Sequence, residues 1–152
     1  MKFLIQRVKE ASVEIDAEIY SKINKGYLVL VGITDSDTEE IADKMIQKMI
    51  GLRIFEDENG KTNLSIKDVG GDMLIVSQFT LYADCKKGNR PSFIKAGKPE
   101  FANDMYQYIL DKTSQLYEKK IYSGQFGADM KVSLINDGPF TVMLDSAEII
   151  SM

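Results

Sequence analysis

Hydrophobic and polar positions alternate along much of the first part of the chain, and this is the period of a β-strand. Lys2–Lys9 and Ala11–Ala17 alternate well enough to predict the two strands of a hairpin. Gly26–Thr34 is almost continuously apolar, so we expect a central strand that is covered on both faces. Asp72–Phe79 predicts a further strand, which runs directly into Thr80. A sheet is therefore expected at the centre of the molecule.

Two segments repeat their apolar residues with the helical period instead. The first predicts a helix near Thr38–Gly51, with N-cap candidates in Asp35–Asp37. The second predicts a helix near Pro99–Lys119, where the proline takes a first-turn position. The apolar positions are Ile41, Met45, Met49 and Leu52 in the first helix, and Phe101, Met105, Tyr108, Ile109 and Leu116 in the second.

The remaining segments complete a pattern of mostly antiparallel strands. Arg53–Glu56 predicts a short strand, and Asp57–Gly60 is a strong turn signal. Asp129–Asn136 and Phe140–Asp145 predict two final strands, joined at Gly138-Pro139. Two main helices among such strands favour a single α+β domain over residues 1–152, rather than a doubly wound sheet.

Composition narrows the available chemistry. The chain has 152 residues, of which 44% are apolar and 28% charged, as in ordinary globular domains. It contains no histidine, the commonest general base and metal ligand, so we expect neither a metal nor another cofactor. Cys85 is the only cysteine, which we interpret as a bystander thiol and as a sign of a reducing, cytoplasmic location. Apolar runs such as Tyr27–Ile33 are too short to span a bilayer, so no membrane partner is expected.

Charge is distributed unevenly along the chain. The net charge of −4 gives no global attraction for nucleic acid. The segment from Cys85 to Lys98 nevertheless contains five basic residues and no acidic one: Lys86, Lys87, Arg90, Lys95 and Lys98. This segment is either a solvated loop or a local patch for phosphate groups, and the charges alone leave both interpretations open.

The first candidate for chemistry is the polar stretch at the end of the Asp72–Phe79 strand. The hydroxyl of Thr80 is a weak nucleophile unless a base activates it, and threonine is also a routine residue at a strand end. Ser77 and Gln78 can donate and accept hydrogen bonds. Together with backbone N–H groups, they could hold a carbonyl group or stabilise an oxyanion.

The second candidate is Gly138-Pro139. In isolation, this dipeptide indicates an ordinary tight hairpin turn. A glycine also lets a ligand approach the backbone closely, and a cis bond before proline costs only about 0.5–1 kcal/mol. A cis bond would point successive carbonyl oxygens in similar directions, and such a pair suits an ammonium group.

The two motifs together resemble those of the D-aminoacyl-tRNA deacylases, also called D-Tyr-tRNA(Tyr) deacylases. The family carries Ser-Gln-x-x-Leu and Asn-x-Gly-Pro-x-Thr, and every defined position is matched here by Ser77, Gln78, Leu81, Asn136, Gly138, Pro139 and Thr141. The Lys87–Phe93 stretch, the opening Met1–Val13 and the length of the chain are also similar to the family. The resemblance covers essentially the whole chain.

This resemblance implies a barrel-like sheet and a homodimer whose active site lies at the subunit interface. The Gly-cis-Pro dipeptide of one subunit, Gly138-Pro139, would reach into the pocket of the other. The implied activity is hydrolysis of the ester between a D-amino acid, or mischarged glycine, and tRNA, with rejection of L-aminoacyl-tRNA. The implied site residues are Ser77, Gln78, Phe79 and Thr80 at the ester, with Met130 and Ala102 lining the pocket. The partner is then aminoacyl-tRNA and not DNA, with tRNA phosphates held by Lys86, Lys87 and Arg90.

An aminoacyl ester is already activated, so orientation and oxyanion stabilisation could suffice without histidine. The ribose 2′-hydroxyl or a positioned water would then handle the proton. Two alternatives remain open. One is a hydrolase of small esters or amides in which Thr80 is the nucleophile, and the other is a non-catalytic RNA-binding or dimerisation module.

Overall fold

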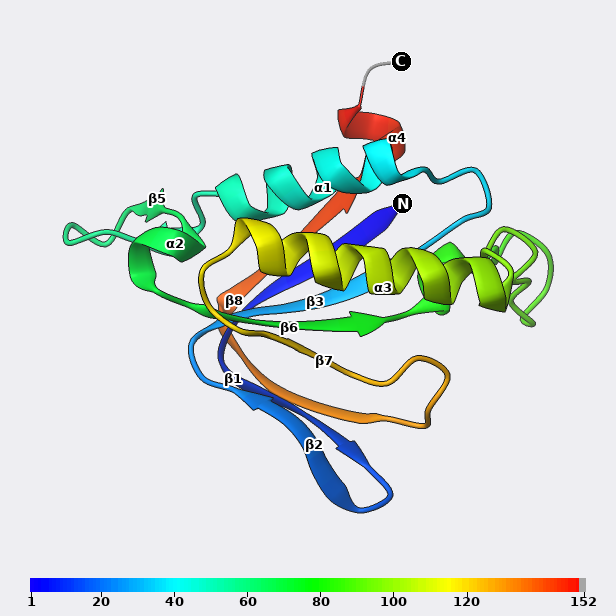
Figure 1. The fold of residues 1–152 in the computed structure, drawn as a ribbon, viewed down its shortest axis with the longest axis horizontal. Coiled ribbons are helices and arrows are strands. Elements are labelled where there is room, and N and C mark those ends of the chain that lie inside the picture. Colours follow the sequence, from blue (N-terminus) through cyan, green and yellow to red (C-terminus); the bar gives the residue numbers. More distant parts are fainter. Residues whose placement is uncertain (151–152) are drawn as a thin grey trace.

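The computed structural model describes residues 1–150 and is built around one six-stranded sheet (Figure 1). Antiparallel pairs join β1 to β2, β3 and β8, whereas β3, β6 and β7 are parallel neighbours. The hydroxyl of Ser21 on β2 donates to the carbonyl of Ser123 on β7 at 2.5 Å, so the two ends of the strand order meet and the sheet nearly closes as a barrel. The strands are β1 Lys2–Ile15, β2 Glu18–Ile23, β3 Gly26–Gly32, β6 Asp72–Ser77, β7 Ile121–Ser123 and β8 Lys131–Asp145.

The predicted break in the first strand is wrong. β1 runs unbroken from Lys2 to Ile15, and the hairpin turn follows at Asp16-Ala17, where both residues have positive φ. The polar pair Lys9-Glu10 is exposed and coincides with a shift in the register between β1 and β8. The loss of alternation therefore marks an irregular ladder and not a turn.

The predicted final hairpin is also wrong. β8 is one strand, and both of its halves pair with β1. Gly138-Pro139 therefore interrupts a continuing strand and does not join two neighbouring ones. Proline cannot donate to a ladder, but a bulge needs no donor at that position.

Two helices, α1 Glu39–Gly51 and α3 Pro99–Leu116, cover one face of the sheet (Figure 1). Both lie where the helical period predicts, although α3 ends before Lys119. The apolar core between helices and sheet includes Phe3, Ile5, Met45, Met49, Tyr106 and Ile109. A second apolar cluster, with Val8, Val13, Leu28 and Leu74, fills the inside of the curled sheet.

The N-cap of α1 differs from the prediction. Thr38 caps the helix, because its hydroxyl accepts from the N–H of Ile41 at 3.2 Å. Asp35 instead accepts from the backbone N–H of Lys98, and the buried carboxylate of Asp37 accepts from the N-terminal ammonium of Met1 at 2.8 Å. These acids hold distant segments together, which their place before the helix did not indicate.

The short elements lie at the periphery. The predicted turn at residues 57–60 is confirmed, since the N–H of Gly60 donates to the carbonyl of Asp57 at 3.0 Å and joins a small hairpin. No helix within residues 1–150 is long and apolar enough to cross a membrane. The short elements are β4 Phe55–Glu56, β5 Thr62–Leu64, α2 Ile66–Val69 and α4 Ser146–Ile149.

Candidate active site

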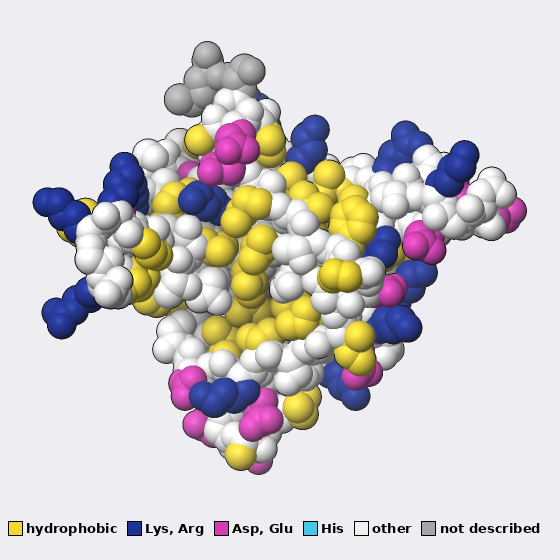
Figure 2. All heavy atoms as spheres, turned by 180° about the vertical axis from the view of Figure 1, so that it is seen from behind, with side chains coloured by type: hydrophobic (Ala, Val, Ile, Leu, Met, Phe, Trp, Pro, Cys, Tyr) yellow, Lys and Arg dark blue, Asp and Glu magenta, His cyan; other side chains and the backbone are white. Residues whose placement is uncertain are grey.

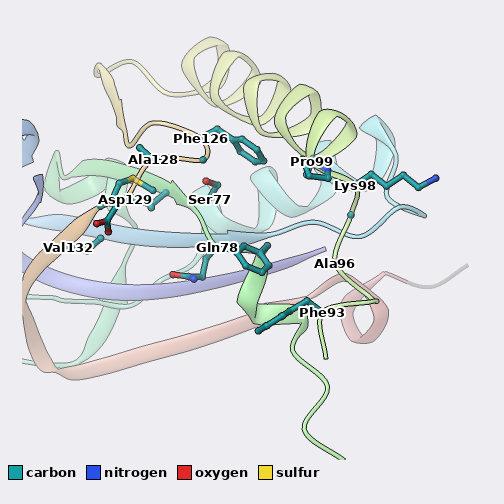
Figure 3. Close-up of a pocket in the computed structure, with 16 residues that line it drawn as sticks. Ser77, Gln78, Phe93, Ala96, Lys98, Pro99, Phe126, Ala128, Asp129 and Val132 are labelled. Atoms are coloured by element: carbon teal, nitrogen blue, oxygen red, sulfur yellow. The ribbon is translucent and has the colours of Figure 1, made fainter. Parts of the chain in front are cut away.

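A pocket of about 720 Å³ opens at the carboxyl end of β6 (Figure 3). Its walls come from three segments: the end of β6 with the 3₁₀ turn that follows, the start of α3 with the loop before it, and the segment that leads into β8. Most of the lining is apolar, with Val76, Phe79, Phe93, Ala102, Phe126 and Met130. The size lies in the range of small-molecule sites, and the apolar walls suit a flat ligand such as a nucleobase.

The Ser77–Thr80 stretch forms the polar wall of this pocket. β6 ends at Ser77, and the N–H of Gln78 still donates to the carbonyl of Val31 at 2.8 Å before the chain enters the 3₁₀ turn Phe79–Tyr82. No side chain caps this turn. The N–H groups of Phe79 and Thr80 open the turn and have no acceptor within it, so they are donors suited to a developing oxyanion.

Thr80 lies beside the pocket, and its surroundings offer no base. The side-chain amide of Gln78 donates to the hydroxyl of Thr80 at 2.5 Å, and an amide cannot take up a proton from it. Asp129 is the only carboxylate in the lining, and both of its oxygens contact the ammonium of Lys131, at 2.9 and 3.0 Å. Within the described residues, the pocket therefore holds donors and hydroxyls but no free general base.

Leu81 fixes the position of the turn. A Cβ on Gly32 at the end of β3 would lie only 2.9 Å from the Cβ of Leu81 and 3.3 Å from the ring of Tyr82. The turn can pack this closely because position 32 carries no side chain. The leucine of the Ser-Gln-x-x-Leu motif is thus a packing residue, which holds the polar wall against the sheet.

The segment from Asp84 to Lys98, called the basic loop below, borders the mouth of the pocket. Its residues Asp84 and Ser92 exchange two backbone hydrogen bonds, at 2.7 and 2.9 Å, and this pairing brings Phe93 to the ring of Phe79, with ring centroids 5.1 Å apart. The N–H of Lys86, and to a lesser extent the ammonium of Lys95, lower the pKa of the Asp84 carboxyl. The predicted phosphate contacts are exposed at the outer part of this loop and do not line the pocket: Lys86, Lys87 and Arg90.

Tyr106 of α3 lies behind the pocket and packs against its lining residue Phe126. The buried hydroxyl of Tyr106 donates to the carbonyl of Ile75 at 2.6 Å, and burial raises the pKa of this hydroxyl to about 12. Its ring lies 6.2 Å from that of Phe126. A Cβ on Gly124 would lie 2.5 Å from the sulfur of the lining residue Met130, so the missing side chain leaves room for the thioether.

Gly138-Pro139 lies outside this pocket, in a bulge of β8. Val8 pairs with Asn136 and Gln6 with Thr141, so two steps along β1 oppose five steps along β8 and three residues of β8 are extra. Both residues of the dipeptide are exposed, Gly138 has φ +141°, and the peptide bond between them is cis, as expected. In this single chain, the bulge and the pocket are separate features.

Arg7 supports the bulge from the side of the helices. Its Nε donates to the carbonyl of Asp137 at 2.9 Å, its Nη1 donates to the carbonyl of Ile54 at 2.6 Å, and its guanidinium lies 4.7 Å from the ring centroid of Phe140. The side chain is buried, with 6% exposure. Arg7 was not among the predicted site residues, although an arginine at an inward position of an alternating strand was the available signal.

The structure therefore gathers some of the predicted residues and separates others. Ser77, Gln78, Phe79, Ala102 and Met130 all line the pocket, with Thr80 beside them. The members of the second motif, Asn136, Gly138, Pro139 and Thr141, gather instead at the bulge. The lining residues Phe126, Ala128 and Val132 were missed, and the glycines at 124 and 127 were the only local sign of a loop there.

Fold and site define a single-domain α+β protein with an apolar pocket, whose wall at the end of β6 carries hydroxyl, amide and backbone N–H groups. The model of one family, described as D-Tyr-tRNA(Tyr) deacylase, matches residues 4–145. A D-aminoacyl-tRNA deacylase of Flavobacterium psychrophilum is 57% identical over 146 residues, covering 96% of this chain and 97% of its own. One of Thermosipho melanesiensis is 48% identical, covering 98% and 99%.

Solved structures agree in fold. A structure described as c-Myc DNA unwinding element binding protein has a TM-score of 0.91 and 41% identity, covering 95% of this chain and 98% of that one. A structure described as a probable eukaryotic D-amino acid tRNA deacylase has a TM-score of 0.84, covering 94% and 97%; at 16% identity, this likeness concerns the fold alone. The chain belongs to the D-Tyr-tRNA(Tyr) deacylase family, and it is accordingly a deacylase, a hydrolase.

Proposed function

We propose that this protein hydrolyses the ester between a D-amino acid and the 3′-terminal adenosine of tRNA, releasing the free amino acid and tRNA. The observation that carries the proposal is that the uncapped 3₁₀ turn Phe79–Tyr82, which follows Ser77 and Gln78, begins at the wall of an apolar pocket. Aromatic and aliphatic walls suit the adenine base, and the turn presents donors where an ester carbonyl would lie next to the ribose.

Catalysis in this proposal depends on position and electrostatics. The N–H groups of Phe79 and Thr80 stabilise the oxyanion that forms when the ester carbonyl is attacked. The attacking group is a water or hydroxide that the substrate 2′-hydroxyl or the pocket orients, because no free base stands at Thr80. An oriented and activated ester needs no covalent intermediate on the enzyme.

The acting species is a homodimer in which Gly138-Pro139 of each subunit enters the pocket of the other. Figure 2 shows apolar side chains gathered on the face that the helices leave open. An apolar row runs across the neighbouring strands through paired residues: Met143, Leu4, Leu30 and Val76. Met143 is 45% exposed, and Val76 at the other end of the row lines the pocket. An isologous pair over this face would cover the row and bring each bulge towards the partner's pocket.

Discrimination follows from this arrangement. If the carbonyl oxygens of Gly138 and Pro139 accept the substrate ammonium, an L side chain collides with the same backbone, whereas a D side chain points away. Glycine has no side chain to collide, so glycine mischarged on tRNA is also a substrate. The reaction then removes D-amino acids and glycine from the tRNA pool of the cytoplasm and proofreads chirality in translation.

The basic loop extends the site towards the body of the tRNA. Its exposed side chains lie beyond Phe93 at the mouth of the pocket, where the phosphates that precede the terminal adenosine would pass. Each neutralised phosphate releases counterions, which makes affinity salt-dependent. The partners in this proposal are a second copy of the chain and aminoacyl-tRNA, without DNA or membrane.

One assay tests the proposal. The protein is incubated with D-Tyr-tRNA and L-Tyr-tRNA, and the release of amino acid is followed for each. Rapid release from the D ester alone is expected. A threonine-nucleophile hydrolase would leave an acyl group on Thr80, detectable by mass spectrometry after a rapid quench, and a non-catalytic module would bind tRNA without release. Equal release from both esters would refute the chirality argument.

A further inference from the structure

The bulge in β8 has two supports, on opposite faces of the sheet. The side chain of Arg7 supports it from the helix side. On the open face stand Asn136 and Thr141, the two residues at which the ladder with β1 stops and resumes. Their partners Val8 and Gln6 are two positions apart on β1 and so point to the same face, and this places the two side chains on that face as well.

These two side chains close the base of the bulge. The Nδ2 of Asn136 donates to the hydroxyl of Thr141 at 2.8 Å, and the Oδ1 of Asn136 accepts from the N–H of Phe140 at 2.6 Å. One amide thus satisfies a backbone donor that has lost its ladder partner and ties the two flanks of the bulge together. Only Asn, Asp, Gln or Glu could make both contacts, and Asn is the shortest of these that still carries a donor.

We propose that Asn136 and Thr141 are positioning residues for Gly138-Pro139, forming a clamp that sets how far and in which direction the dipeptide projects. This inference rests on the proposed function, in which the dipeptide discriminates between D and L esters in the partner's pocket. The three extra residues have no ladder bonds to orient them, and Gly138 at φ +141° has no side chain to pack. The clamp is the only side-chain link across the base of the bulge within the described residues on this face.

The spacing of the motif follows from this geometry. An asparagine can reach across the bulge to a hydroxyl only if the ladder resumes close to it in space, although the two residues are five apart in sequence. Asn136 and Thr141 at the two ends of the bulge therefore serve the same purpose as Gly138-Pro139 at its tip, which is to present two backbone carbonyls in a fixed position. The end residues do not touch the substrate; they act through the backbone between them.

The experiment compares Thr141→Val, which removes the hydroxyl at nearly constant shape, with Thr141→Ser, which keeps it. Ser133→Ala is the matched control, because it removes an exposed hydroxyl from the same strand outside the bulge. For each protein, kcat/KM is measured on D-Tyr-tRNA and L-Tyr-tRNA, and thermal unfolding is recorded. A displaced dipeptide should lower the D:L ratio about tenfold to a hundredfold in Thr141→Val, with Thr141→Ser and Ser133→Ala close to wild type.

Other outcomes overturn the inference. A D:L ratio within twofold of wild type in Thr141→Val would do so, and so would a proportional loss on both esters, since a general structural defect does not change their ratio. Asn136→Asp is the second variant, for use if Thr141→Val does not fold: its carboxylate accepts from both Phe140 and the Thr141 hydroxyl, so the clamp predicts a wild-type ratio, and a tenfold drop would contradict it.

A failure of the proposed function is distinguishable from a failure of the clamp. If wild-type protein releases neither amino acid, the proposed function is wrong. The clamp is then judged by hydrogen exchange at the amide of Phe140, which should become faster in Thr141→Val and stay unchanged in Ser133→Ala.

Discussion

Replacing Arg7 by methionine tests how a buried charge without a carboxylate partner is held. The guanidinium is 6% exposed and is satisfied by the carbonyls of Asp137 and Ile54, together with the ring of Phe140. No ion pair of Arg7 is found within residues 1–150. Methionine fills much of the same volume, so the change removes the donors and the charge while it leaves most of the packing.

The expected loss in the free energy of unfolding depends on which carbonyl is left without a donor. The Ile54 carbonyl is bound in a buried contact, and losing its donor costs about 1–3 kcal/mol. The carbonyl of Asp137 accepts in a partly buried contact next to the exposed Gly138-Pro139, so water can replace the lost donor at a lower cost. Removing the guanidinium also relieves its desolvation, which offsets part of the loss. We therefore expect Arg7→Met to lower the free energy of unfolding by about 1–3 kcal/mol, and Tm by about 2–12 °C.

Arg7→Lys gives the sharper comparison. Lysine keeps the charge but lacks the planar fork that reaches two carbonyls in different directions. The charge stays buried with fewer hydrogen bonds, so this variant should be at least as destabilised as Arg7→Met, even though it is the more conservative change. Lys9→Met is the control on the same strand, because that side chain is exposed and its loss should change stability by less than about 0.5 kcal/mol.

Urea unfolding of the three variants at neutral pH gives the comparison directly. If Arg7→Met and Arg7→Lys both stay within 0.5 kcal/mol of wild type, about the error of such measurements, the loss of the donor to the Ile54 carbonyl carries no measurable cost and the reasoning is refuted. If Arg7→Lys is clearly more stable than Arg7→Met, then the charge matters more than the geometry of its donors.

Four further predictions follow from the site. Thr80→Ala should lose less than about tenfold in kcat, because the hydroxyl has no base beside it; a loss of many orders of magnitude with intact binding would restore Thr80 as nucleophile. Replacing the basic side chains of the loop should reduce the slope of log affinity against log salt by about 0.7–0.9 for each lost phosphate contact, as measured by tRNA titration of variants at Lys86, Lys87 and Arg90. Gly124→Ala should raise KM, because its Cβ would lie 2.5 Å from the sulfur of Met130 and push the thioether into the pocket; an unchanged KM would show that the thioether has other room. The folded pKa of Asp84 is lowered, so its contribution to loop order is complete above the ordinary carboxyl pKa of about 3.9 and is lost as pH falls through the lower folded value. Exchange at the amide of Ser92, corrected for its intrinsic rate, should therefore accelerate only in acid, and a constant corrected rate would contradict this.

The sequence pattern predicted those helices and strands that are determined by residues within the same segment. The helical period and the first-turn proline located both α1 and α3, and the continuous apolar run located β3. The pattern failed where the cause lies on another strand. Lys9-Glu10 was interpreted as the end of a strand, yet the adjoining register shift lies in the pairing of β1 with β8, more than a hundred residues away.

The site residues also fall into those that the local sequence predicts and those that depend on distant segments. The polar wall at Ser77–Thr80 was visible because a polar stretch ends an apolar strand. Gly138-Pro139 could be identified as a motif from the sequence, but its position within a continuing strand could not. A proline in a turn and a proline in a bulge have the same local sequence pattern, and only the pairing of both flanks with β1 distinguishes them. Phe126 gave no local signal, and the inward position of Arg7 did not show which carbonyls it would bind, because each contributes through a segment that only the folded chain brings near.

The pairing of β1 with β8 also orders events during synthesis. β1 ends at residue 15 and β8 begins at residue 131, so at roughly 5–20 residues per second the first strand waits on the order of 10 s for its longest partner. Throughout that time, one edge of β1 is unpaired and open to strands of other molecules. Met130 and the bulge also emerge only at the end, so a chain stopped on the ribosome before residue 130 lacks one wall of the pocket and the whole of the projecting dipeptide.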